Sequence, residues 1–203
     1  MVVTMSLDVP AFIDGEIAKS RAGLAELESP EYAQTLTDIA NKAVEAIRAG
    51  GKIMFCGNGG SAADSQHLAA ELVGRQNYNR APAAGIALTV DTSALTAIGN
   101  DYGYDNVFSR QVEALGNAGD VLIGISTSGR SQSVVRAIES ANAKGITTVS
   151  FTGREARDMS IADIRLAVPA TETAKIQELH ITCGHIVFAL VERILFPLEA
   201  PPQ

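Results

Sequence analysis

The alternation of short apolar runs with helical stretches, from residue 52 to residue 168, is the feature that most constrains the fold. Five such runs are present: KIMFCG (52–57), GIALTV (85–90), DVLIGIS (120–126), TTVSFTG (147–153) and IRLAV (164–168). Strands that alternate with helices form βαβ units, whose right-handed crossovers build a parallel sheet. The sequence therefore predicts an α/β fold with a parallel five-stranded sheet flanked by helices, in a flavodoxin-like or Rossmann-like three-layer arrangement.

Helices are expected on both sides of this alternating region. Two N-terminal helices are predicted over residues 11–28 and 29–51, and a long C-terminal helix over residues 173–196. In the second helix, Ser29 is placed to cap the first turn, and Pro30 occupies the first helical position.

One structural domain is expected, because 203 residues with 46% hydrophobic side chains are enough to bury a single core. Within this domain we distinguish N-terminal helices (1–50), a main α/β part (51–197) and a tail (198–203). The last residues of the tail, 199–203, are expected to be frayed.

Composition excludes several classes of function. The net charge is −7 and the Lys and Arg residues are scattered, so the chain lacks the basic surface that a nucleic-acid partner requires. The first residues lack the pattern of a signal peptide, and no stretch approaches the ~18 apolar residues that span a bilayer. We therefore expect a cytoplasmic protein with no membrane partner, in which Cys56 and Cys183 remain reduced thiols.

A glycine-rich loop follows the first expected strand and leads into a helix. Its residues are Gly57, Asn58, Gly59, Gly60 and Ser61. Glycines let the backbone approach a ligand closely, and free N–H groups at a helix N-terminus favour an anion. The spacing of Gly57, Gly59 and Ala62 also matches the dinucleotide pattern G-x-G-x-x-G/A, but the acidic residue expected about 20 positions later has no good candidate. The alternative without a ligand is a tight turn capped by Ser61.

A second polar loop follows the third expected strand and again precedes a helix. It comprises Ser126, Thr127, Ser128, Gly129, Arg130 and Ser131. Four hydroxyl groups and several backbone amides suit one phosphate monoester without dense positive charge; the alternative is a solvated turn with an N-cap. A third loop, over residues 91–106, supplies Asn100 and Asp101 for a sugar hydroxyl, or as turn or cap residues.

Four side chains have a spacing that suits a divalent metal. His67 and Glu71 lie four residues apart on one helix, separated by about 40° around its axis. On the last helix, Gln177 and His185 are separated by about 80° and could reach one site, whereas His180 points about 140° away from His185. Gln is an uncommon zinc ligand. The alternatives are a surface hydrogen bond for the first pair and a core position for a histidine of the last helix.

Four segments of the sequence together indicate a known family. They are GNGGSAADSQHLAAELVGR (57–75), LTVDTSALTAIGNDYGYDNVFSRQVEALG (88–116), GDVLIGISTSGRS (119–131) and KIQELHITCGHIVFALVE (175–192). With them the chain resembles the sugar isomerase (SIS) domain family and, within it, the phosphoheptose isomerases, over nearly its whole length.

The resemblance implies the isomerisation of D-sedoheptulose 7-phosphate to D-glycero-D-manno-heptose 7-phosphate. In the family this is the first step towards ADP- or GDP-heptose precursors of surface glycans such as lipopolysaccharide or capsule. The resemblance also implies a homotetramer with active sites at subunit interfaces, in which the N-terminal helices pack on the domain and on neighbouring subunits.

Matching positions carry the family's site residues onto this chain. The implied ligands of one Zn²⁺ per subunit are His67, Glu71, Gln177 and His185. The implied substrate contacts are Asn58, Gly59, Gly60, Ser61, Asp64, Glu71, Arg75, Asn100, Asp101, Ser126, Thr127, Ser128, Ser131 and Gln177. The sequence departs from the family at TGREARDM (152–159), where relatives usually carry Gly-Gly, so the shape of this loop is not implied.

Glu71 is the candidate base and His185 the candidate acid for isomerisation through an enediol, with zinc polarising the carbonyl. Because a carboxylate committed to a metal is a poorer base, we expect Glu71 to shift between metal and substrate. One alternative is a non-catalytic SIS module that binds a replication initiator protein, and another is an SIS isomerase for a different sugar phosphate. The non-catalytic relatives have neither a carboxylate nor an imidazole at the positions of Glu71 and His185, and this chain has both.

Overall fold

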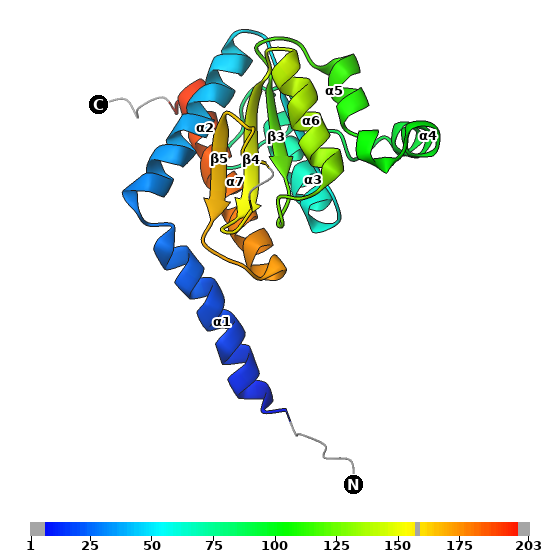
Figure 1. Ribbon diagram of the computed structural model, residues 1–203. Coiled ribbons are helices and arrows are strands. Elements are labelled where there is room, and N and C mark those ends of the chain that lie inside the picture. Colours follow the sequence, from blue (N-terminus) through cyan, green and yellow to red (C-terminus); the bar gives the residue numbers. More distant parts are fainter. Residues whose placement is uncertain (1–6, 157–158, 199–203) are drawn as a thin grey trace, which may run out of the picture.

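The computed structural model describes residues 7–156 and 159–198 and has three layers (Figure 1). The strands are β1 (Ile53–Gly57), β2 (Gly85–Ala87), β3 (Val121–Ile125), β4 (Thr147–Gly153) and β5 (Ile164–Val168). Every neighbouring pair is parallel, and the order across the sheet is β2-β1-β3-β4-β5. This is the flavodoxin-like order, so the predicted fold class is confirmed.

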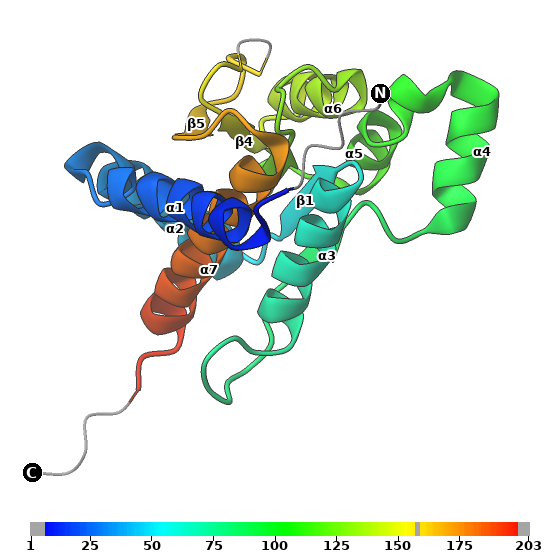
Figure 2. The ribbon, with the colours of Figure 1, turned by 90° about the horizontal axis from the view of Figure 1, so that it is seen from below.

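Helices cover both faces of the sheet. They are α1 (Val9–Glu26), α2 (Pro30–Arg48), α3 (Gly60–Val73), α4 (Thr92–Tyr102), α5 (Ser109–Leu115), α6 (Gln132–Ala143) and α7 (Thr173–Leu195), with a short 3-10 helix η1 (Tyr104–Asn106). Helices α2, α3 and α7 pack on one face, and α5 and α6 pack on the other. Helix α1 extends away from the sheet in Figure 1, and α4 stands apart at the side in Figure 2.

The core lies on both faces of the neighbouring strands β1 and β3. All five residues of β1 and all five of β3 are buried, as expected for parallel strands covered by helices on each side. Phe55 and Phe188 meet edge to face on the α2, α3 and α7 side, at 5.4 Å between ring centres. Phe108 and Ile138 are buried on the opposite side. This packing fixes the strands whose carboxyl ends carry the two polar loops.

One local prediction was wrong, and another was confirmed only in part. Residues 91–106 were expected to form a loop, but residues 92–102 form α4 and residues 104–106 form η1. Asp91 caps α4 by accepting a 2.9 Å hydrogen bond from the backbone N–H of Ala94, which supplies the helix start that the sequence interpretation overlooked. Ser29 stands at the N-cap of α2, but its side chain makes no cap hydrogen bond.

The remaining sequence expectations concern the termini and the thiols. Of the tail, only Leu198 belongs to the described residues, so the expected fraying of 199–203 lies outside them. Cys56 and Cys183 are both buried and free. None of the described helices is both long enough and apolar enough to cross a membrane.

Candidate active site

Asn58 joins the glycine-rich loop to the serine loop at the carboxyl ends of β1 and β3. Its amide nitrogen donates hydrogen bonds to the hydroxyls of Ser131, at 2.9 Å, and Ser133, at 3.0 Å. Its amide oxygen accepts a 2.7 Å hydrogen bond from the hydroxyl of Tyr104 in η1. Two loops that are more than 70 residues apart in the sequence therefore form one polar surface.

The backbone of both loops requires glycine at one position. Gly59 has a φ of +57° and Gly129 a φ of +66°, in the left-handed region that side chains disfavour. At Gly129 a Cβ would also overlap the side chain of Ala156. These two glycines thus let the loops turn tightly, with their amides and hydroxyls at the ends of the strands.

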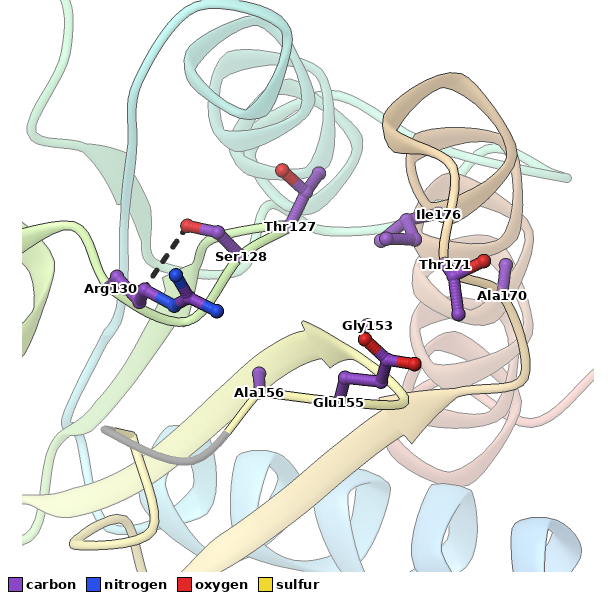
Figure 3. Close-up of a pocket in the computed structure, with 9 residues that line it drawn as sticks. All are labelled: Thr127, Ser128, Arg130, Gly153, Glu155, Ala156, Ala170, Thr171 and Ile176. Carbon is purple, nitrogen blue, oxygen red and sulfur yellow. Dashed lines mark hydrogen bonds between the residues drawn. The ribbon is translucent and has the colours of Figure 1, made fainter.

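A polar pocket of about 160 Å³ lies beside the serine loop (Figure 3). Thr127, Ser128 and Arg130 line one side of it, and Glu155 and Thr171 line the other. The backbone N–H of Arg130 donates to the Ser128 hydroxyl at 3.3 Å. The pocket also borders the divergent segment 152–159, of which residues 157–158 lie outside the described residues.

Three potential metal ligands meet between α3 and α7. The Nε2 atoms of His67 and His185 are 2.9 Å apart, and Oε1 of Glu71 lies 3.4 Å from the first and 3.5 Å from the second. Their ligand atoms all lie within 4.8 Å of one another. The i, i+4 spacing on α3 and the position of His185 on α7 therefore bring two imidazoles and a carboxylate to one point.

These distances fit a zinc ion. Nitrogen and oxygen ligands lie about 2.0–2.2 Å from zinc, so two ligands at a tetrahedral angle are about 3.4 Å apart. Both distances from Glu71 match this value, whereas the two imidazole nitrogens, at 2.9 Å, are closer than this value and would separate as they bind the ion. Two neutral imidazoles and a carboxylate are also donors that zinc commonly takes.

Gln177 and His180 lie on different sides of α7. The amide of Gln177 lies against the backbone of Gly60, where a Cβ would overlap it, so Gln177 reaches the N-terminal end of α3. His180 instead packs against the sheet, with 1% of its surface exposed. His180 therefore takes the core position that the sequence offered as the alternative for a histidine of the last helix. His185 instead belongs to the group formed with His67 and Glu71.

Two carboxyl groups at the site are partly desolvated. Burial raises the pKa of Asp64, one turn before His67, and the nearby imidazoles of His67 and His185 lower it by less. Its Oδ2 atom and the Oε2 atom of Glu71 are buried without a hydrogen-bond partner among the described residues. Glu71 therefore faces the imidazoles through one oxygen only, and no hydrogen bond from the described residues holds the other.

Within the described residues, three expected substrate residues form no hydrogen bond or ion pair with the group of His67, Glu71 and His185. Asn100 and Asp101 are exposed on α4, and the Asn100 amide donates to the Asp101 carboxylate at 2.7 Å. None of the α4 residues is buried. Arg75 is exposed just after α3. The described chain therefore brings His67, Glu71 and His185 together, and it places the expected substrate residues Asn100 and Asp101 on a different helix.

Sequence reasoning missed two residues at the junction of the loops. Ser133 lies two positions beyond the serine loop, and its place in the first turn of the following helix was an available signal. Tyr104 gave no local signal, because its partner Asn58 is 46 residues away.

Comparisons with known proteins agree on one family. The model of the SIS domain matches residues 17–153. The phosphoheptose isomerase of Akkermansia muciniphila is 55% identical over 162 residues, which cover 79% of this chain and 86% of that protein. That of Maridesulfovibrio salexigens is 51% identical over 183 residues, 89% of each chain. The structure of phosphoheptose isomerase GmhA from Neisseria gonorrhoeae is similar with a TM-score of 0.84 and 42% identity, covering 90% of this chain and 99% of that one.

Proposed function

The chain belongs to the phosphoheptose isomerases of the SIS domain family and isomerises sedoheptulose 7-phosphate; we propose that Glu71 and His185 carry out the proton transfers beside one zinc ion. The observation that carries this proposal is the meeting of His67, Glu71 and His185 between α3 and α7, with their ligand atoms within 4.8 Å of one another.

His67, Glu71 and His185 would hold the zinc ion, with Gln177 as the fourth ligand. When bound, zinc supplies a Lewis acid that polarises the substrate carbonyl and orients the neighbouring hydroxyl. The ligand distances support this assignment, because those from Glu71 equal the separation of about 3.4 Å expected for two ligands of a tetrahedral ion.

Glu71 is the base and His185 the acid in this proposal. Glu71 removes a proton from C1 of the ketose and returns it to C2, while His185 moves a proton between O1 and O2. The unpartnered Oε2 atom of Glu71 supports a carboxylate that shifts between metal and substrate. The atoms balance, because the same two hydrogens are redistributed and no other reactant is consumed.

The phosphate binds at the two polar loops in this proposal. Ser61, Ser126, Thr127, Ser128 and Ser131 offer hydroxyls there, and α3 and α6 begin at these loops. Helix N-termini and backbone amides attract anions without a dense cluster of basic residues. Asn58 is the residue best placed to hold both loops around one phosphate, since it bonds across them.

A homotetramer with active sites at subunit interfaces is also part of the proposal. Helix α1 exposes an apolar stripe at helical spacing, formed by Val9, Phe12, Ile13, Ile17 and Leu24. Exposed apolar patches of this kind mark protein contacts. With α1 and α4 largely uncovered, a neighbouring subunit would bring Asn100 and Asp101 to a site. Light scattering tests the mass, and Ile13→Glu with Ile17→Glu should dissociate the assembly.

Glu71→Gln tests the catalytic assignment. The amide keeps the size of the side chain but cannot accept a proton from carbon, so kcat should fall by about 10²–10⁴-fold. Turnover of sedoheptulose 7-phosphate is followed by formation of the aldose. Calorimetry should show that sugar-phosphate binding is largely retained.

Glu139→Gln on the exposed surface of α6 is the matched control and should leave kcat unchanged. Removal of metal with a chelator should abolish turnover, and added zinc should restore it. Full activity of Glu71→Gln would overturn the role of Glu71 as base, and full activity of the metal-free protein would overturn the role of zinc.

A further inference from the structure

The segment that follows α3, residues 75–80, crosses to α7 and is called the strap here. The backbone N–H groups of Gln76 and Asn77 donate to the carboxylate of Glu192 on α7, at 3.0 and 2.9 Å. The hydroxyl of Tyr78 donates a hydrogen bond that is shared between two backbone carbonyls, that of Glu192 at 3.1 Å and that of Phe196 at 2.8 Å. The strap is thus attached to the last turn of α7 and to the residue that follows it.

A buried ion pair joins the end of the strap to α7. Arg80 Nε donates to Glu192 Oε1 at 3.1 Å, and the two side chains are 4% and 1% exposed. The same guanidinium donates to the carbonyls of Glu71 at 2.6 Å, Leu72 at 2.8 Å and Gly74 at 3.1 Å. Since the last carbonyls of a helix have no partner within it, Arg80 caps the C-terminal end of α3.

Two strap bonds end on the backbones of the residues assigned to proton transfer. Arg80 bonds the carbonyl of Glu71, and the side-chain amide of Gln76 donates to the carbonyl of His185 at 2.9 Å. Glu192 follows His185 by seven residues, so both lie within about 20° of one another around α7. A continuous chain of bonds therefore runs from the backbone of Glu71, through Arg80 and Glu192, to the helix that carries His185.

The stability of the fold alone does not explain why Arg80 and Glu192 are charged at this buried position. A buried ion pair is often no more stabilising than apolar side chains of similar volume, but its hydrogen bonds fix direction and distance. A metal or catalytic site needs its groups within about 0.5 Å of the working geometry. The Leu68 side chain of α3 lies close to the backbone of Gly184 in α7, which lets the two helices approach, and the strap bonds add the directional restraint.

We propose that Gln76, Arg80 and Glu192 are positioning residues, which set Glu71 against His185 by holding the end of α3 to α7. The inference rests on the proposed function, because it assumes that these two side chains act together at one metal.

The test compares strap variants with a matched control elsewhere in the sheet. Glu192→Gln removes the negative charge of the ion pair, and Gln76→Leu removes only the bond to the His185 carbonyl. The control is Asp120→Asn: Asp120 is 1% exposed, pairs with Lys52 at 2.5 Å and accepts the Asn117 N–H at 2.8 Å. It lies just before β3, at the end of the sheet opposite the site. Zinc affinity of metal-stripped protein is measured by competition with a chromophoric chelator, together with Tm and kcat.

Glu192→Gln and Asp120→Asn should both lower Tm, because each disturbs a buried carboxylate. Only Glu192→Gln and Gln76→Leu should weaken zinc binding, by about 10–100-fold, and lower kcat more than they raise KM, while Asp120→Asn stays within about twofold. If Glu192→Gln does not fold, Gln76→Leu decides. Strap variants with wild-type zinc affinity and kcat would overturn the inference while leaving the proposed function intact. Wild-type protein that binds no zinc would overturn the metal assignment and the inference together.

Discussion

The two sides of α7 place the same residue type in opposite surroundings. On the side that faces α3, the His185 side chain is 43% exposed, and its Nε2 atom is 2.9 Å from that of His67. On the side that faces the sheet, His180 is 1% exposed, with its ring centre 5.7 Å from that of Phe151. Position around the helix, and not residue type, separates a candidate catalytic histidine from a core histidine.

The sheet side also changes the chemistry of its imidazole. Burial lowers the pKa of His180 to about 4, and a backbone contact with Thr152 opposes this only in part. Neither ring nitrogen has a hydrogen-bond partner within the described part of the chain. His180 is therefore a neutral, inert group at physiological pH, whereas His185 faces a carboxylate and a second imidazole.

The largest effect is expected for His185→Asn. Loss of the imidazole removes the proposed acid and one proposed metal ligand, so kcat should fall by about 10²–10⁴-fold. Aldose formation from sedoheptulose 7-phosphate measures the loss. His180→Leu is the matched substitution on the other side of the helix and should retain wild-type kcat. Equal losses in both variants would contradict the distinction between the two sides.

The next effect concerns stability and pH at His180. Its pKa is about 4 in the folded protein and near 6.5 when unfolded, so the unfolded chain takes up the proton first as pH falls. The free energy of unfolding is therefore highest above pH 6.5 and falls on acidification. The loss due to His180 is about 2 kcal/mol at pH 5 and about 3 kcal/mol below pH 4.

His180→Leu should remove this loss. Its free energy of unfolding should be within about 1 kcal/mol of wild type at pH 7.5, because a partnerless imidazole is replaced by an apolar group. At pH 5 the variant should exceed wild type by about 2 kcal/mol more than at pH 7.5. Denaturant unfolding at the two pH values measures the difference, and parallel curves would show that His180 does not titrate as the structure indicates.

A third prediction concerns the close approach of α7 to α3. A Cβ on Gly184 would lie 2.7 Å from a methyl carbon of the buried Leu68, which adjoins His67. Gly184→Ala should therefore lower the free energy of unfolding by about 1–2 kcal/mol through overpacking. Zinc affinity should fall about tenfold as the ligands separate.

Gly15→Ala is the control, because no atom lies within 4 Å of its Cβ position. In that exposed helix, alanine should stabilise by up to about 1 kcal/mol. A stabilising effect of Gly184→Ala would show that the helices can adjust without disturbing the site.

Periodicity and spacing predicted much of this arrangement, because they report on local geometry. The strand runs gave the parallel sheet, and the angles around α7 separated His180 from His185. The strap was not predicted, since Arg80 and Glu192 are 112 residues apart and their pairing depends on the packing of α3 on α7. One signal was available: Glu192 is an acidic residue in the apolar run IVFALVERILF. The helix α4 was missed because Asp91 was not interpreted as its cap.

The smallest effect is expected for Gln177→Leu. This variant tests whether Gln177, on the side of α7 that faces α3, is a zinc ligand in addition to His185. A neutral amide is a weaker zinc ligand than an imidazole or a carboxylate, so zinc affinity should fall only about tenfold. The partly exposed position should keep stability within about 0.5 kcal/mol of wild type. Chelator competition measures the affinity. Unchanged affinity would restrict the protein ligands to His67, Glu71 and His185, which leaves the fourth position open to substrate, as in zinc sites that bind their substrate directly.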